Sequence, residues 1–407
     1  MSTLFEKPCV TFAVMMINGI NNPKISHMLA MTYRGPYRVR TEQKPYPEIL
    51  HPQDAIVRVE RSCICGSDLH LYHGLVPDTR VGMTFGHEFV GVVEEVGSAV
   101  QKVKTGDAVI VPFNIACGTC VFCRQGLYSN CHEANPEATA LGGIFGYSHT
   151  AGGYEGGQAE YVRVPYADVG PTIIPEGMDL DDAVLLTDVV PTGYQAAEMG
   201  GIRTGDTVVV FGAGPVGIMA AKSAWLFGAG RVIVLDELEY RLDFVRQYAQ
   251  CEAYNFRSMD DPVKFLKETT GWFGADVCID AVGMEASGSK LQTITGKKLM
   301  LQSGSGLALQ WAINGVKKGG IVSIVGVYGP IGNLIPIGNV VNKGLTIRAN
   351  QVAVKRHLPK LIKHVQDGLI NPKAIITHRV PLNEIAEAYH IFSAKLDNCI
   401  KPVLIPS

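Results

Sequence analysis

Four cysteines fall within fifteen residues, spaced C-x2-C-x2-C-x7-C, and are the clearest candidates for chemistry in this chain. The other six of its ten cysteines are scattered. In a chain of 407 residues with no recognisable export signal, clustered cysteines favour a bound metal over a disulfide framework. Four thiolates can surround one ion tetrahedrally, which is the closed ligation of structural zinc. The four residues are Cys117, Cys120, Cys123 and Cys131.

Two other interpretations of this cysteine cluster stay open. An iron–sulfur cluster can use cysteines at such spacing, although the chain has no second cluster motif. The thiols could also carry no ligand at all. His132 follows Cys131 directly and could substitute for a cysteine ligand, but we interpret it as a bystander.

A glycine-rich turn indicates a second kind of chemistry, the binding of a dinucleotide. An apolar run at 208–211 precedes the turn, a helical stretch to about residue 228 follows it, and a second apolar run, 231–236, ends in a carboxylate. Strand, glycine turn, helix and acid-terminated strand make up the dinucleotide-binding fingerprint. The glycines let the backbone approach a pyrophosphate, which then sits on free N–H groups at the helix start. The turn residues assigned to the cofactor are Gly212, Gly214, Pro215, Val216 and Gly217.

The acid that ends the second apolar run indicates which nucleotide binds. Asp236 comes 19 residues after Gly217, close to the offset expected for the carboxylate that binds a ribose 2′-hydroxyl. A carboxylate there repels a 2′-phosphate, so the sequence favours NAD over NADP. The alternative is an ordinary turn between strand and helix, because a bare G-x-G-x-x-G is common.

The elements that must position these motifs divide the chain into three segments. Short strands punctuated by glycine in residues 1–190 predict a compact β-barrel-like lobe, with the cysteines in a smaller lobe at about 113–135. Residues 191–338 contain the glycine fingerprint and further apolar strands, which predict a parallel sheet with helices between its strands. Residues 339–407 are expected to return and complete the first lobe. Residues 1–30 match no pattern and are a docking arm, a flexible tail or a misplaced start.

Composition excludes several classes of partner. Lysine and arginine total 36 against 38 acidic residues, so no excess positive charge attracts nucleic acid or an anionic membrane. No apolar run approaches the length of a membrane span. The apolar segment 10–20 lacks a basic start and a small-residue cleavage site, so we do not interpret it as a signal peptide and expect a cytoplasmic protein.

Along nearly all of residues 31–407, the chain resembles the zinc-dependent medium-chain alcohol dehydrogenase family. The resemblance rests on the cysteine lobe, the glycine fingerprint, the returning C-terminal segment and two short patterns, Cys65-Gly66-Ser67-Asp68-x-His70 and Gly86-His87-Glu88. Within the family the chain is most similar to the glutathione-independent formaldehyde dehydrogenase branch, at residues 111–114, 156–161 and 188–194. The resemblance implies an α/β protein with a GroES-like, β-rich catalytic domain and a Rossmann domain whose doubly wound parallel sheet binds NAD.

The same resemblance implies two zinc ions per subunit, one structural and one catalytic. Cys65 and His87 match catalytic ligands, and the third ligand position, often a cysteine in the family, falls on Asp188, as it does in the formaldehyde dehydrogenase branch. One thiolate, one imidazole and one carboxylate leave a fourth position open for water or a substrate oxygen. Considered singly, His87 could be a core histidine and Asp188 an acid at a helix end.

Four further residues match supporting roles around the catalytic zinc. Glu88 matches the family's second-sphere acid, and Asp68 matches the carboxylate that orients the ligating imidazole. Ser67 and His70 match a proton relay from the substrate hydroxyl through the nicotinamide ribose to solvent, although each could be a plain surface residue.

The resemblance also places contacts to the cofactor outside the glycine turn. Thr192 and Val327 match positions that contact the nicotinamide, and Lys401 matches a basic residue on the pyrophosphate. Arg241 lies over the adenine or is simply a solvated helix charge.

Two departures bear on how firmly NAD is held. Some alcohol dehydrogenases carry a basic residue directly after the first zinc cysteine, whereas this chain has Gly66, so one phosphate contact is missing. Residues 284–310 match in position a loop that covers the cofactor in the formaldehyde dehydrogenase branch. We therefore hypothesise tightly held NAD, which absorbance of the denatured supernatant would detect.

The implied activity is hydride transfer between NAD and an alcohol or an aldehyde hydrate, in a homodimer or homotetramer. A polyol or sugar dehydrogenase, of the sorbitol or threonine type, is the rival within the family, because those enzymes share Cys65, His87 and the glycine motif. A rival from another class is a non-catalytic NAD-binding sensor, against which the intact Ser67 and His70 argue.

Overall fold

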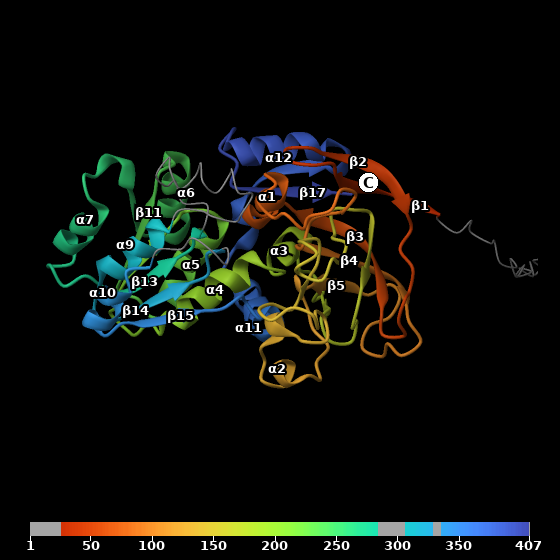
Figure 1. The fold of residues 1–407 in the computed structure, drawn as a ribbon, viewed down its shortest axis with the longest axis horizontal. Helices are drawn as coiled ribbons and strands as arrows, with labels where there is room; N and C mark the ends of the chain where they lie inside the picture. Colours follow the sequence, from red (N-terminus) through yellow and green to blue (C-terminus); the bar gives the residue numbers. More distant parts are fainter. Residues whose placement is uncertain (1–25, 284–305, 329–334, 407) are drawn as a thin grey trace, which may run out of the picture.

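The computed structural model describes residues 26–283, 306–328 and 335–406, which form two lobes side by side (Figure 1). One lobe contains a parallel sheet with helices, and the other is built mainly of antiparallel strands. β17 (Lys401–Ile405), at the end of the chain, pairs with β3 (Ala55–Cys63), near its beginning. The C-terminal segment therefore completes the lobe that the N-terminal segment begins, and the expected α/β architecture is confirmed.

The strands of the second lobe hydrogen-bond in the order β16-β17-β3-β4-β5-β9, and β8 also pairs with β3. Their bounds are Phe89–Val96 for β4, Ala108–Val111 for β5, Tyr161–Val164 for β8, Thr172–Ile173 for β9 and Ile376–Pro381 for β16. A hairpin of β1 (His27–Tyr33) and β2 (Val39–Pro45) forms a separate small sheet.

Further helices and short strands lie around this sheet. They are α1 (Gly66–Tyr72), β6 (Asn114–Ile115), α2 (Val121–Arg124), β7 (Gly143–Ile144), α3 (Leu180–Leu185), α11 (Val354–Gln366) and α12 (Ile385–Ala394). Two of them, α1 and α2, carry candidate site residues. Because α1 begins directly after Cys65, the end of β3 and the start of this helix fix that side chain at the boundary between the lobes.

The six strands of the other lobe are all parallel, in the order β12-β11-β10-β13-β14-β15. Their bounds are Thr207–Phe211 for β10, Arg231–Asp236 for β11, Glu252–Asn255 for β12, Ala275–Asp280 for β13, Val316–Ile324 for β14 and Thr346–Ala349 for β15. The helices of this lobe are α4 (Val189–Gly200), α5 (Pro215–Leu226), α6 (Glu239–Ala249), α7 (Pro262–Thr269), α9 (Leu307–Gly315) and α10 (Ile337–Lys343). The strand order reverses between β10 and β13, and ligands of such sheets bind at the carboxyl ends of the strands at this switch point.

The glycine turn lies at this switch point, between β10 and α5. A β-carbon on Gly217 would lie 1.9 Å from the carbonyl oxygen of Gly212, so no larger residue fits there. Gly212 has a φ of +96°, which side chains disfavour. The turn therefore requires both glycines, and α5 begins with Pro215 at its first position, where a missing N–H costs nothing.

The structure moves one expected boundary. Strand β15 pairs with β14 in the parallel sheet, so this sheet continues beyond residue 338, where we expected the nucleotide-binding segment to end. The expected N-terminal extension and most of the loop expected at 284–310 lie outside the described residues. No helix in the described ranges is long and apolar enough to cross a membrane.

Candidate active site

A cleft of about 370 Å³ joins the two groups of residues that the sequence singled out. Its lining includes Cys65, His87 and Asp188 as well as the glycine turn and Asp236. The cleft therefore brings a possible metal site and a possible nucleotide site into one continuous space.

The ligand atoms of Cys65, His87, Glu88 and Asp188 all lie within 4.8 Å of one another. The Nε2 atom of His87 is 3.2 Å from Oδ2 of Asp188, and Sγ of Cys65 is 3.8 Å from the same oxygen. Cys65, His87 and Asp188 come from separate parts of the fold, namely the start of α1, the residues before β4 and the start of α4. A thiolate, an imidazole and a carboxylate that converge in a cleft fit a catalytic zinc site with one open position.

The charge balance of the site suits a cation. Burial acts to raise the pKa of Asp188, but the hydrogen bond and charge of His87, the hydrogen bond from Thr192 and the charge of Lys401 together hold the pKa of this carboxyl below its usual range. Burial raises the pKa of the Cys65 thiol, so without a cation this sulfur stays protonated. A metal ion would supply the positive charge that a thiolate in this partly buried position requires.

The residue expected to orient the imidazole is in place. Oδ1 of Asp68 lies 3.3 Å from Nδ1 of His87, on the opposite side of the ring from Asp188. Oδ2 of Asp68 accepts a hydrogen bond from the backbone N–H of Cys65 at 2.8 Å. Asp68 thus connects two of the candidate ligands.

Both expected relay residues also line the cleft. Ser67 Oγ is 3.4 Å from Nε2 of His87, which places the hydroxyl beside the candidate metal site. His70 is 3% exposed and lies one turn further along α1. Their roles in proton transfer stay predictions.

Lys401 forms a buried ion pair with Glu88. Its Nζ lies 2.5 Å from Oε2 of Glu88, and both side chains are fully buried. Burial acts to lower the pKa of Lys401, but the Glu88 carboxylate, together with Cys63 and Cys65, raises this pKa. A buried carboxylate needs such a countercharge, so the ammonium neutralises Glu88. Lys401 also lines the cleft, and its contact with a pyrophosphate stays a prediction.

Asp236 lines the cleft at the carboxyl end of β11 and is bound to the glycine turn. Its Oδ2 accepts the backbone N–H of Ala213 at 2.6 Å, and its Oδ1 accepts the N–H groups of Glu237 and Leu238 at 2.7 and 2.9 Å. The turn and the acid that the sequence paired are thus physically connected.

The remaining cofactor candidates also line the cleft. Thr192 donates its hydroxyl to Oδ1 of Asp188 at 2.6 Å, so one residue connects the metal site to α4. Arg241 donates its Nε to the hydroxyl of Tyr240 at 3.2 Å, and Val327 is 38% exposed. A β-carbon on Gly66 would meet no atom within 4 Å, so the site expected to lack a basic side chain is open space.

Sequence reasoning missed the apolar wall of the cleft. Phe113 packs edge-on against His87 with ring centroids 5.7 Å apart. Leu141, Ile144 and Tyr147 also line the cleft. Phe113 belongs to a stretch that supported the resemblance, but no periodicity indicated that these side chains face the site.

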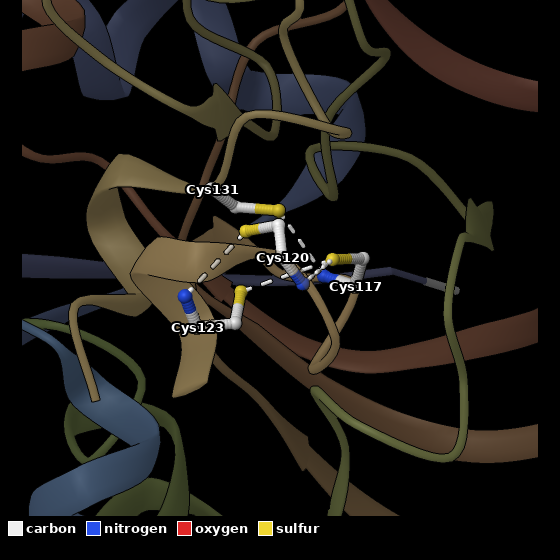
Figure 2. Close-up of side chains that lie close together, drawn as sticks. All are labelled: Cys117, Cys120, Cys123 and Cys131. Atoms are coloured by element: carbon white, nitrogen blue, oxygen red, sulfur yellow. Dashed lines mark hydrogen bonds between the residues drawn. The ribbon is translucent and has the colours of Figure 1, made fainter. Parts of the chain in front are cut away.

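The four clustered cysteines converge on one point (Figure 2), and none of them lines the cleft. Their sulfur atoms all lie within 4.8 Å of one another, and those of Cys117 and Cys123 are 4.0 Å apart. Four sulfurs placed about 2.3 Å from one central ion lie about 3.8 Å from each other in a tetrahedron. The cluster therefore fits a single ion, and His132 is not among the converging residues.

Backbone N–H groups favour thiolates in this lobe. Cys117 Sγ accepts the N–H of Cys120 at 3.3 Å, and Cys120 Sγ accepts the N–H of Cys123 at 3.5 Å (Figure 2). Burial acts to raise the pKa of Cys120, but hydrogen bonds, first that from Cys123, lower this pKa to about 6. All described cysteines are free of disulfides.

Comparisons with known proteins agree along most of the chain. Residues 51–176 match the family described as "Alcohol dehydrogenase GroES-like domain", and residues 215–299 match "Zinc-binding dehydrogenase". An uncharacterised zinc-type alcohol dehydrogenase-like protein of Bacillus subtilis is 43% identical over 93% of this chain and 100% of its own length.

Two further comparisons concern a narrower relative and a solved structure. The glutathione-independent formaldehyde dehydrogenase of Bacillus subtilis is 39% identical over 64% of this chain and 67% of its own. The structure of an alcohol dehydrogenase from Thermus sp. ATN1 superimposes with a TM-score of 0.81 at 33% identity, covering 93% of this chain and all of that one.

Proposed function

We propose, from the premise that this chain belongs to the zinc-dependent medium-chain alcohol dehydrogenase family, that its cleft oxidises a small alcohol with NAD. One observation carries the proposal: Cys65, His87 and Asp188 converge in the same cleft as the glycine turn and Asp236. Such a cleft can hold a substrate oxygen close to a nicotinamide, which is the geometry that hydride transfer requires.

Different residues of the cleft would bind the metal and transfer the proton. When bound, zinc supplies a Lewis acid that lowers the pKa of an alcohol hydroxyl. Cys65, His87 and Asp188 would hold this ion, and Ser67, beside His87, would accept the substrate proton. His70 would pass the proton on, because it lies next to Ser67 on α1 and lines the same cleft.

The wall of the cleft supports an apolar substrate. Phe113, which packs against His87, lines the cleft with Leu141 and Ile144, and these three side chains offer no hydrogen-bonding groups; Tyr147 adds one hydroxyl to this wall. A polyol would leave its extra hydroxyl groups without partners there, which costs about 1–3 kcal/mol for each group. Formaldehyde would enter as its hydrate, which presents a hydroxyl as an alcohol does. The partial likeness to a formaldehyde dehydrogenase supports this substrate as a second candidate.

Turnover separates these activities directly. We expect NADH formation, followed by absorbance, with short apolar alcohols or formaldehyde and at least tenfold less with sorbitol or threonine. Sorbitol as the best substrate would favour the polyol rival. A zinc-loaded protein that binds NAD but reduces none with any substrate would instead be the non-catalytic sensor.

A single substitution tests the preference for NAD over NADP. We expect Asp236→Asn to raise the ratio of kcat/KM for NADP to that for NAD by about tenfold, or about 1.4 kcal/mol, because it removes the charge that repels a 2′-phosphate. The amide keeps an oxygen for part of the backbone contacts that Asp236 makes. The matched control is Asp243→Asn, which removes the same charge from an exposed position on α6. An unchanged ratio in Asp236→Asn would contradict the assignment.

A further inference from the structure

The carboxylate of Asp68 has a further hydrogen-bond donor that takes no part in the proposed active site. Asp68 is fully buried, and its Oδ1 faces His87 while its Oδ2 accepts from Cys65 N–H. Oδ2 has a second donor, the side-chain amide of Gln158, whose Nε2 lies 3.3 Å away. A carboxylate held by donors on one oxygen presents its other oxygen in a fixed direction.

Gln158 is fixed on all sides. It is fully buried, and its Nε2 also donates to the backbone carbonyl of Cys63 at 3.0 Å. A β-carbon on Gly86, the residue before His87, would lie 2.4 Å from Cγ of Gln158. A glycine is therefore needed at position 86 for this glutamine to pass close to the backbone there.

The orientation of the Gln158 amide is set by a residue near the other end of the chain. Tyr389, on α12, donates its hydroxyl to Oε1 of Gln158 at 2.9 Å, and both side chains are fully buried. Burial raises the pKa of Tyr389 well above its usual value, so the phenol keeps its proton and remains a donor. A donor at Oε1 directs the NH₂ group of the amide toward Asp68 and Cys63.

We propose that Gln158 and Tyr389 are positioning residues for His87: Tyr389 orients the Gln158 amide, which holds Asp68, which in turn orients the imidazole. The chain of contacts runs through residues from four separate parts of the sequence. Hydrogen bonds join Tyr389 to Gln158 and Gln158 to Asp68, and an ion-pair contact of 3.3 Å joins Asp68 to His87. The proposal rests on the metal site of the proposed function. It predicts that the two residues control how long a metal stays at His87, although neither contacts that metal.

Release of zinc to a chromophoric chelator tests this without any substrate. We expect the catalytic ion to leave about 10–100 times faster from Gln158→Met, the range seen for outer-sphere partners, and several times faster from Tyr389→Phe. The structural ion should leave at an unchanged rate. The kinetic phase of this ion is identified with Cys65→Ala, because that variant lacks a ligand of the catalytic ion and should release only the structural one. The absorption spectrum of the Co²⁺-exchanged protein should shift in both positioning variants, since it reports ligand geometry at His87.

A double variant and a matched control sharpen the test. Because Tyr389 acts through Gln158, the double variant should release the ion at the rate of Gln158→Met alone. Tyr248→Phe removes a tyrosine hydroxyl that donates to the carbonyl of Asn371 at 3.0 Å. Tyr248 does not line the cleft, so this variant should change neither rate nor spectrum. If Gln158→Met does not fold, Tyr389→Phe, which loses a single atom, carries the test.

Three results would overturn the proposal. They are unchanged release from both single variants, equal acceleration of the catalytic and structural phases, and additive effects in the double variant. A protein that passes this test but oxidises no alcohol would refute the proposed function and leave the positioning role standing.

Discussion

A Cys65→Ala variant is expected to lose turnover by on the order of 10³-fold or more while keeping its fold. The substitution removes one of three ligand-type side chains that converge in the cleft, and the remaining imidazole and carboxylate cannot hold zinc in the same geometry. The loss of fold stability should be small, because Cys65 lies at the start of α1 and is partly exposed. NADH formation, metal content and circular dichroism measure the three quantities separately.

The matched control is Cys251→Ala. Cys251 lies in the nucleotide-binding lobe, is partly exposed and belongs to neither group of converging ligands. It should keep both zinc ions and its activity. Full activity in Cys65→Ala, with a metal content unchanged from the parent protein, would show that the catalytic metal has been assigned to the wrong residues.

The second large effect is on stability. Cys120→Ala is expected to lower the Tm by about 10 °C and to reduce the zinc content from two ions to one, because a structural ion with three of four thiolates loses several kcal/mol of binding free energy that is also folding free energy. Cys120 begins α2 and accepts the N–H of Cys123, so its loss also removes a cap of this short helix. Differential scanning calorimetry and metal analysis measure these changes.

Catalysis should respond differently from stability in this variant. At temperatures well below the lowered Tm, kcat is expected to stay within about threefold of the parent value, because none of the four cysteines lines the cleft. A Tm and a zinc content equal to those of the parent protein would mean that the four thiols hold no structural metal. Cys251→Ala again serves as the control for loss of a cysteine.

The local elements of the nucleotide-binding sheet could be predicted because their signals are short in range. The apolar runs before and after the glycine turn became β10 and β11, and the helix between them became α5. Gly212 and Gly217 could be predicted for the same reason, because a turn that tight admits only glycine, whichever residues surround it. The convergence of the four cysteines was also predictable, since they are close in sequence and short turns bring their sulfur atoms together.

Long-range contacts were less accessible. The sheet order that places β15 beside β14 depends on which strands pair, and no local pattern near residue 338 indicates that the parallel sheet continues. The partner of Lys401 likewise depends on β17 returning beside β3, which brings its ammonium to Glu88. A basic residue near the end of the chain has many possible partners until the chain has folded.

The sequence by itself determined the chemical types of the site, namely a thiolate, an imidazole and carboxylates for a metal, and a glycine turn with an acid for a nucleotide. The tertiary structure alone decided which side chains support them. Gln158 stood in a stretch that supported the family resemblance, yet only folding brings it between Asp68 and Tyr389, residues more than two hundred positions apart in the sequence. Ligand types follow from side-chain chemistry, which the sequence gives for each residue. The orientation of these ligands follows from packing between distant segments, which no local sequence pattern gives.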